Sequence, residues 1–138
     1  FLGILWDGFV GNFFNQEILG TPTAGALGMY VSPQNRPTGY QGSAFFYPVF
    51  LYESALCLLA LIALLIVKSR VKLKDGSIFL LYLILYSFIR FFIEFIRIEE
   101  KIALGFTLGQ LVSLLIFIIS IVVFVLINKK KSKKKSRR

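Results

Sequence analysis

The sequence predicts an all-α fold: a polytopic membrane helix bundle with three full transmembrane helices, the end of an N-terminal helix and a long outer loop. Three apolar stretches carry this prediction, because a hydrocarbon core of roughly 30 Å is crossed by about 20 helical residues. Backbone polar groups find no water in lipid, so such stretches form helices and not single strands. Of the 138 residues, 57% are hydrophobic and 17% are charged. This composition argues against a soluble domain.

The three stretches are residues 49–67, 77–96 and 108–127, and they differ in polar content. The first contains one charge, Glu53, the second contains Arg90 and Glu94, and the third contains none. Residues 1–14 are apolar but short and interrupted by glycine. They are expected to be the end of a further helix that starts upstream.

The basic residues predict the orientation of the chain, since Lys and Arg are enriched in cytoplasmic segments. Twelve of the 16 lie in two blocks, and these are Lys68, Arg70, Lys72, Lys74, Lys129, Lys130, Lys131, Lys133, Lys134, Lys135, Arg137 and Arg138. If three helices alternate, both blocks and the C-terminus are cytoplasmic, and segments 20–48 and 97–106 are outside. Residues 1–128 then form a single membrane domain, and residues 129–138 form a basic cytoplasmic tail.

The composition also excludes several kinds of site within this chain. The net charge of +9 is concentrated in flanks of apolar stretches, so no nucleic-acid partner is expected. There is no His and one Cys, Cys57. His-based triads, His or Cys metal sites and a disulfide framework are therefore excluded. The tail either forms a solvated flank or contacts anionic headgroups.

Four residues of the second apolar stretch form the strongest candidate site. Tyr86, Arg90, Glu94 and Arg97 follow one another at spacings of four, four and three, which places them on one face of one helix. Ionisable groups at membrane depth are costly and indicate a functional site. A pair of arginines suits a phosphate, because the guanidinium presents a planar fork of donors. The alternative is an Arg90–Glu94 ion pair that only stabilises the bundle.

A second polar group lies in residues 11–20, GNFFNQEILG. Asn12, Asn15, Gln16 and Glu17 are flanked here by apolar side chains. Buried amides and carboxylates need partners, so we expect these residues to face the interior of the bundle. The alternative is a helix end whose amides cap backbone groups.

Two helix starts carry further polar residues. Glu53 lies in the first turns after Pro48, where it either complements the helix dipole or has a catalytic role. At the last stretch, Thr107 is a candidate N-cap and Gly109 permits close helix approach. Gln110 follows at a position from which it could reach the cavity.

Together, four segments resemble the prolipoprotein diacylglyceryl transferases, bacterial membrane enzymes that lipidate lipoprotein precursors. GNFFNQEILG is similar to the family signature G-R-x-G-N-F-x-N-x-E-x-x-G, and YPVFLYES is similar to H-P-x-x-L-Y-E-S. YSFIRFFIEFIR is similar to Y-x-x-x-R-F-x-x-E-F-x-R, and FTLGQLVS to L-T-M-G-Q-x-x-S. The four segments occur in the family order and cover most of the chain.

The resemblance implies an activity and its partners. The diacylglyceryl group of phosphatidylglycerol would pass to the lipobox cysteine thiol of a preprolipoprotein, forming a thioether and releasing glycerol-1-phosphate. It implies no metal and no cofactor. It also implies a multi-pass protein of the bacterial plasma (inner) membrane, which we expect to be a monomer.

The resemblance further implies roles for individual residues. The implied catalytic residues are Arg90, Glu94, Tyr86 and Glu17, and the implied substrate-binding residues are Asn12, Asn15, Gly20 and Arg97. Arg90 would bind the lipid phosphate, Glu94 would orient Arg90, and Tyr86 would bond a lipid oxygen. Asn12 and Glu17 would line the cavity.

Two positions depart from the family pattern. Phe9 stands where the signature has Arg, and Tyr47 stands where it has His before Pro. The family's His-Gly-Gly segment would lie upstream of this sequence. These departures leave open a relative that binds phosphatidylglycerol or lipoprotein precursors without turnover. A third hypothesis is a small transporter component that uses the Arg90 face as an anion path.

Overall fold

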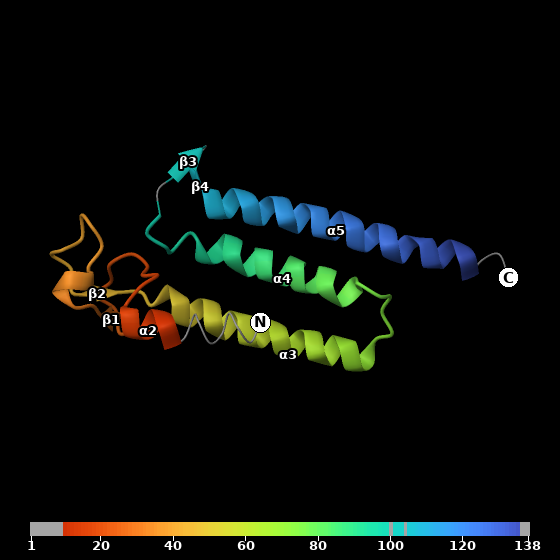
Figure 1. Ribbon diagram of the computed structural model, residues 1–138, viewed down its shortest axis with the longest axis horizontal. Helices are drawn as coiled ribbons and strands as arrows, with labels where there is room; N and C mark the ends of the chain where they lie inside the picture. Colours follow the sequence, from red (N-terminus) through yellow and green to blue (C-terminus); the bar gives the residue numbers. More distant parts are fainter. Residues whose placement is uncertain (1–9, 100, 104, 136–138) are drawn as a thin grey trace.

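The computed structural model describes residues 10–99, 101–103 and 105–135, and in this part of the chain shows three long helices with two small sheets at one end, β1 with β2 and β3 with β4 (Figure 1). The elements in chain order are α2 (Asn12–Asn15), β1 (Met29–Tyr30), η2 (Pro33–Asn35), β2 (Phe45–Phe46), α3 (Val49–Arg70), α4 (Ser77–Ile93), β3 (Lys101–Ala103), β4 (Phe106–Thr107) and α5 (Leu108–Lys135). The predicted mainly helical fold is confirmed.

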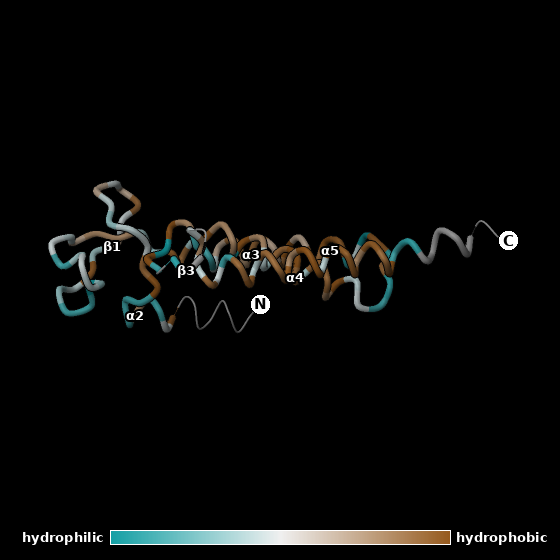
Figure 2. The backbone as a smooth tube through the Cα atoms, turned by 90° about the horizontal axis from the view of Figure 1, so that it is seen from above, coloured by the Kyte–Doolittle hydropathy of each residue, from teal (hydrophilic) through white to brown (hydrophobic). Residues whose placement is uncertain are grey.

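The helices α3, α4 and α5 form a single layer with α4 in the middle, and each runs antiparallel to its neighbour (Figure 1). Hydrophobic residues cover the centre of this layer, and hydrophilic residues gather towards its two ends (Figure 2). Two helices, α3 and α5, are long and apolar enough to cross a membrane, and only 33% and 17% of their most apolar windows are buried. A core helix of a soluble protein would be mostly buried. The exposed apolar surface therefore fits membrane insertion.

The end of the second predicted stretch differs from the expectation. The helix α4 has 17 residues and ends at Ile93, not at residue 96. At 1.5 Å per residue it is about 25 Å long. Residues 94–96 form a hydrogen-bonded turn, in which Ile96 N donates to the Ile93 carbonyl (3.1 Å). The chain then pairs with a distant segment, because the Ile96 carbonyl accepts a hydrogen bond from Thr21 N (3.0 Å) and Ile98 N donates to the Leu19 carbonyl (3.4 Å). A tight turn followed by backbone pairing thus takes the place of the last predicted helical turn.

The long segment that the sequence predicts to lie outside, called the outer segment from here on, is ordered by the same kind of pairing, and its paired strands are called the outer sheet. Segment 19–23 pairs with residues 96–98 on one side and with residues 45–47 on the other, through the bridges Gly20–Arg97 and Pro22–Phe46. The strand β2 then pairs antiparallel with β1. The core of the outer segment contains three buried side chains, which are Leu19, Val31 and Phe46. The outer segment is therefore a small folded unit that closes one end of the helical layer.

The N-terminal prediction can be followed from residue 10 onwards, since residues 1–9 lie outside the described part. The short helix α2 ends at Asn15, and Gln16 adopts a left-handed conformation with φ 53°. The ring of Phe13 lies 6.4 Å from that of Phe50. This contact places α2 beside the start of α3 (Figure 1).

We expect Gly20→Ala to destabilise the protein. A Cβ at position 20 would lie 2.7 Å from Cγ2 of Val49 and 2.9 Å from the Ile96 carbonyl oxygen. Overpacking of this kind costs about 1–3 kcal/mol. Thermal unfolding in nanodiscs measures the effect, and Gly42→Ala is the matched control because nothing lies within 4 Å of a Cβ there. Equal stability of the two variants would contradict the close packing.

Candidate functional site

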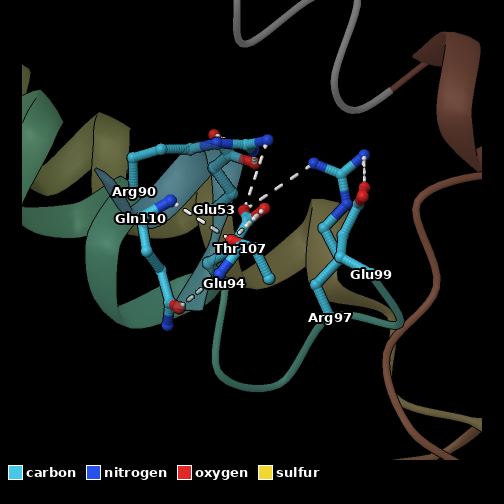
Figure 3. Close-up of polar contacts among 7 residues, drawn as sticks. All are labelled: Glu53, Arg90, Glu94, Arg97, Glu99, Thr107 and Gln110. Carbon is cyan, nitrogen blue, oxygen red and sulfur yellow. Dashed lines mark hydrogen bonds and ion pairs between the residues drawn. The ribbon is translucent and has the colours of Figure 1, made fainter. Parts of the chain in front are cut away.

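Charged and polar side chains from all three long helices meet at the end of the layer beside the outer sheet (Figure 3). Glu53 comes from α3 and Arg90 from α4, and Glu94 is the residue directly after α4. The other residues drawn are Arg97, Glu99, Thr107 and Gln110. Each helix therefore contributes to one polar cluster at this end of the layer, which is called the outer end because it adjoins the outer sheet.

Arg90 is held by a carboxylate of a neighbouring helix. Its Nη1 donates to both carboxylate oxygens of Glu53, at 3.0 and 3.2 Å. Its Nη2 lies 3.5 Å from Oε2 of Glu94, four residues along the chain. The intrahelical pair considered from the sequence is thus present, but the hydrogen-bonded partner of Arg90 is Glu53. Glu53 therefore does more than complement the helix dipole, because its carboxylate binds a side chain of another helix.

Glu94 is the most buried charge of the cluster, with 3% of its side chain exposed. Its Oε2 lies 3.5 Å from Arg90 Nη2 and 3.9 Å from Arg97 Nη1. Its Oε1 accepts a hydrogen bond of 3.1 Å from the Thr107 hydroxyl. Two arginines and a hydroxyl thus compensate a carboxylate that would otherwise be costly to bury.

The start of α5 forms a capping box that supports Glu94. Gln110 N donates to the Thr107 hydroxyl oxygen (3.2 Å), and Thr107 N donates to Oε1 of Gln110 (3.0 Å). The predicted N-cap is confirmed, and Gln110 completes the reciprocal T-x-x-Q pattern. A Cβ at Gly109 would lie 2.5 Å from Oε1 of Glu94. Gly109 therefore lets this carboxylate approach the first turn of α5, as the sequence suggested for close approach.

The charges of the cluster nearly cancel, and some donors stay available. Glu53 and Glu94 balance Arg90 and Arg97, while Arg97 also lies 2.9 Å from the half-exposed Glu99. Within the described residues, Nε and Nη2 of Arg90 donate no hydrogen bond, and 23% of this side chain is exposed. A phosphate oxygen can therefore be bound without removing either carboxylate. In the same part of the chain, no group of three Asp, Glu, Cys or His side chains could hold a metal ion.

The four residues predicted on one helix face come together only in part through the helix. Tyr86 and Arg90 lie in α4 and Glu94 caps it, but Arg97 lies beyond the helix and bridges Gly20. The single-helix prediction is wrong for Arg97, which reaches Glu94 from an extended segment. The Tyr86 ring stacks on Tyr82 at 6.1 Å, and its hydroxyl makes no hydrogen bond within the described residues.

The polar residues of segment 11–20 divide into a structural and a solvent-facing group. The amide oxygen of Gln16 accepts from Ser32 N (3.0 Å) and from Nδ2 of Asn35 (3.1 Å), so this amide stabilises the outer segment. Glu17 lines an open pocket of ≈ 260 Å³ that Arg97 also lines. Among the described residues, the side chains of Asn12 and Asn15 form no hydrogen bond and do not line this pocket.

Glu17 is flanked by two residues in a rare conformation. Gln16 has φ 53° and Ile18 has φ 55°. A β-branched residue in the left-handed region is strained, at a cost of order 1–3 kcal/mol, and such strain is found at functional sites. The turn therefore holds Glu17 at the pocket against a local conformational preference.

Of the two positions that depart from the family pattern, Phe9 lies outside the described residues. Tyr47 packs against the buried cluster around Val49, with its ring 6.5 Å from that of Tyr52. Its carbonyl accepts a hydrogen bond of 2.8 Å from Gly20 N. Tyr47 therefore joins the outer sheet to the start of α3.

The family model of prolipoprotein diacylglyceryl transferase matches residues 5–126. The chain belongs to this family. It is 41% identical over 98 residues to the phosphatidylglycerol–prolipoprotein diacylglyceryl transferase of Cutibacterium acnes, covering 71% of the chain and 33% of the relative. It is 43% identical over 96 residues to that of Acaryochloris marina, covering 69% and 35%. No solved structure matches the chain.

The chain spans about a third of the length of these transferases. The match to the family model and the identities to these relatives confirm the family resemblance seen in the four motifs. The sequence reasoning undervalued Glu53 and Thr107, although each left a signal. An acid at membrane depth needs a cation, and the spacing T-x-x-Q before an apolar run is typical of a capping box.

We expect Thr107→Val to destabilise the outer end of the helical layer, and Thr107→Ser to restore it. Valine removes the N-cap, at about 0.5–2 kcal/mol, and leaves Glu94 Oε1 without its donor, at about 1–3 kcal/mol. Thermal unfolding in nanodiscs measures both variants. Ser113→Val, which changes another buried hydroxyl of α5, is a further comparison. Full stability of Thr107→Val would contradict a stabilising role for the hydrogen bond between the Thr107 hydroxyl and Glu94.

We expect Glu53 and Arg90 to be energetically coupled. Removing one partner of a buried ion pair leaves the other charge uncompensated, which costs roughly 3–5 kcal/mol. The double variant Glu53→Gln with Arg90→Gln is therefore expected to lose less stability than the sum of the losses in the two single variants. A double-mutant cycle on the unfolding free energy measures the coupling. Additive losses would show that the 3.0 Å contact carries no net interaction.

Proposed function

We propose that the protein transfers the diacylglyceryl group of phosphatidylglycerol to the lipobox cysteine thiol of preprolipoproteins. Membership of the transferase family supports the reaction class. The observation on this chain that carries the proposal is the partly exposed guanidinium of Arg90, held by Glu53 with donors still available. Buried cations in low dielectric stabilise the charge of a departing phosphate.

The reaction needs one bond to form and one to break. The thiolate sulfur attacks the carbon of the diacylglyceryl group that is bonded to a phosphate oxygen. The bond between that carbon and that oxygen breaks. Glycerol-1-phosphate leaves with the electron pair, and the thiol proton passes to a base. Because the thiolate is the nucleophile, the leaving group and the deprotonation both have to be assisted.

We assign the roles within the site as follows. Arg90 binds the lipid phosphate, Glu53 and Glu94 hold its guanidinium in place, and Tyr86 bonds a lipid oxygen. The second arginine of the cluster, Arg97, binds substrate at the pocket it shares with Glu17. The remaining proposed substrate-binding residues are Asn12, Asn15 and Gly20.

We further propose a topology for the membrane. Three helices, α3, α4 and α5, cross it, the polar cluster lies towards the outer face, and the C-terminus is cytoplasmic. The asymmetry of Lys and Arg supports this orientation. Residues 1–128 form one membrane domain of a multi-pass, monomeric protein of the bacterial plasma membrane, and residues 129–138 form its basic tail.

The two departures favour a second candidate function. With Phe9 in place of the signature arginine and Tyr47 in place of the histidine, the protein would bind phosphatidylglycerol or lipoprotein precursors without turnover. Loss of one group that stabilises a transition state typically costs about 10²–10³ in rate. Release of glycerol phosphate by the purified protein separates the two candidates, because the binding protein releases none.

We expect the full reading frame to restore lipoprotein lipidation in a strain depleted of its own transferase. Arg90→Gln is expected to lower the rate by about 10²–10³. Arg90→Lys is expected to recover part of it, because lysine keeps the charge but not the planar fork. Lys101→Gln, an exposed cation beyond α4, is the control. Absence of lipidation both in the unchanged protein and in Phe9→Arg would overturn the transferase proposal.

A further inference from the structure

A second polar site lies at the opposite end of the helical layer from the Arg90 cluster. The connection between α3 and α4 encloses an open cavity of ≈ 650 Å³. Four basic residues line it, which are Lys68, Arg70, Lys72 and Lys74, together with one acidic residue, Asp75. The residues of the outer-end site have no part in it, so this cavity is separate from the proposed reaction.

The cations of the cavity are largely uncompensated. Among the described residues, Lys68, Arg70 and Lys72 form no ion pair, and all three are exposed. The C-terminal dipole of α3 accounts for basic residues in its last turn, Lys68 and Arg70, because a cation is favoured there. It does not account for Lys72, which follows the helix. The helix dipole therefore does not account for all of the positive charge that lines the cavity.

A hydrogen bond and a turn hold the connection that lines the cavity in place. The Lys74 ammonium donates a hydrogen bond to the Ile127 carbonyl of α5, which ties the connection to the neighbouring helix. Gly76 turns the chain into α4 with φ 81°, and no side chain caps that helix start. Backbone N–H groups of an uncapped first turn favour an anion. The basic side chains are thus arranged around a fixed turn.

The position of the cavity along the helices indicates which kind of anion it binds. It lies where the apolar parts of α3 and α4 end, beside the hydrophilic end of the layer (Figure 2). Headgroup phosphates occupy this level in a bilayer, and each nearby Lys or Arg contributes about 1 kcal/mol of attraction to anionic lipid. A lipid could place its acyl chains along the exposed apolar faces and its phosphate in the cavity.

We propose that the cavity between α3 and α4 binds the phosphate headgroup of an anionic lipid in the leaflet opposite to the Arg90 cluster. Lys68, Arg70 and Lys72 hold the phosphate, and Lys74 fixes the connection against α5. The protein would then carry a structural lipid at one end, independent of any lipid at the other end. The binding does not depend on turnover.

Native mass spectrometry of the full chain, released from nanodiscs of phosphatidylcholine with phosphatidic acid, tests this proposal. The variant with Lys68→Gln, Arg70→Gln and Lys72→Gln is expected to lose its preference for phosphatidic acid by about tenfold or more. The matched control is Lys133→Gln, Lys134→Gln and Lys135→Gln, which removes the same charge near the end of α5. Its preference is expected to change by less than about twofold, since these positions lie roughly 9–12 Å beyond Ile127 along the helix.

Each other outcome overturns the proposal. Equal losses in the two triple variants would show diffuse attraction, and no loss in the first would show no site. Displacement of the lipid by inorganic phosphate would indicate a free-anion site. Loss of the retained lipid in Arg90→Gln would place it at the outer end. Glycerol phosphate release by the unchanged protein reports on the proposed transferase separately, so the two proposals can fail independently.

Discussion

The carboxylate of Glu94 is the constraint on which the outer end of the bundle depends. It is almost completely buried, and it contacts Arg90 and Arg97 on one side and Thr107 on the other. A buried charge without partners would cost several kcal/mol, so these groups have to stay together. The end of α4, the start of α5 and the extended segment after α4 are thereby held at one point.

The outer sheet adds a pocket beside this point. Backbone pairing of segment 19–23 with residues on both sides brings Gly20 against α3 and the chain after α4. Glu17 lies next to the strained residue Ile18 and lines the same pocket as Arg97. Rigid backbone contacts, and not flexible loops, position the polar groups, which is the arrangement that a preorganised anion site requires.

The two ends of the helical layer use charge in different ways. At the outer end, two buried acids, Glu53 and Glu94, lie beside two half-buried arginines, so each guanidinium is paired with a carboxylate. At the other end, Lys68, Arg70 and Lys72 stay exposed around an open cavity, and they form no ion pair in the described part of the chain. The net charge of +9 therefore describes mainly one end of the molecule, while the candidate site contributes almost nothing to it.

The apolar stretches, the N-cap at Thr107 and the family could all be predicted from the sequence, because they follow from composition, local spacing and four ordered motifs. It also indicated Arg90 and Glu94 as interacting, since residues four apart are neighbours on a helix. The packing of the helices was needed to show that Glu53 is the hydrogen-bonded partner of Arg90 and that α4 ends at Ile93. Glu53 precedes Arg90 by 37 residues, and such a contact depends on the register of packed helices. Local periodicity carries no information about that register.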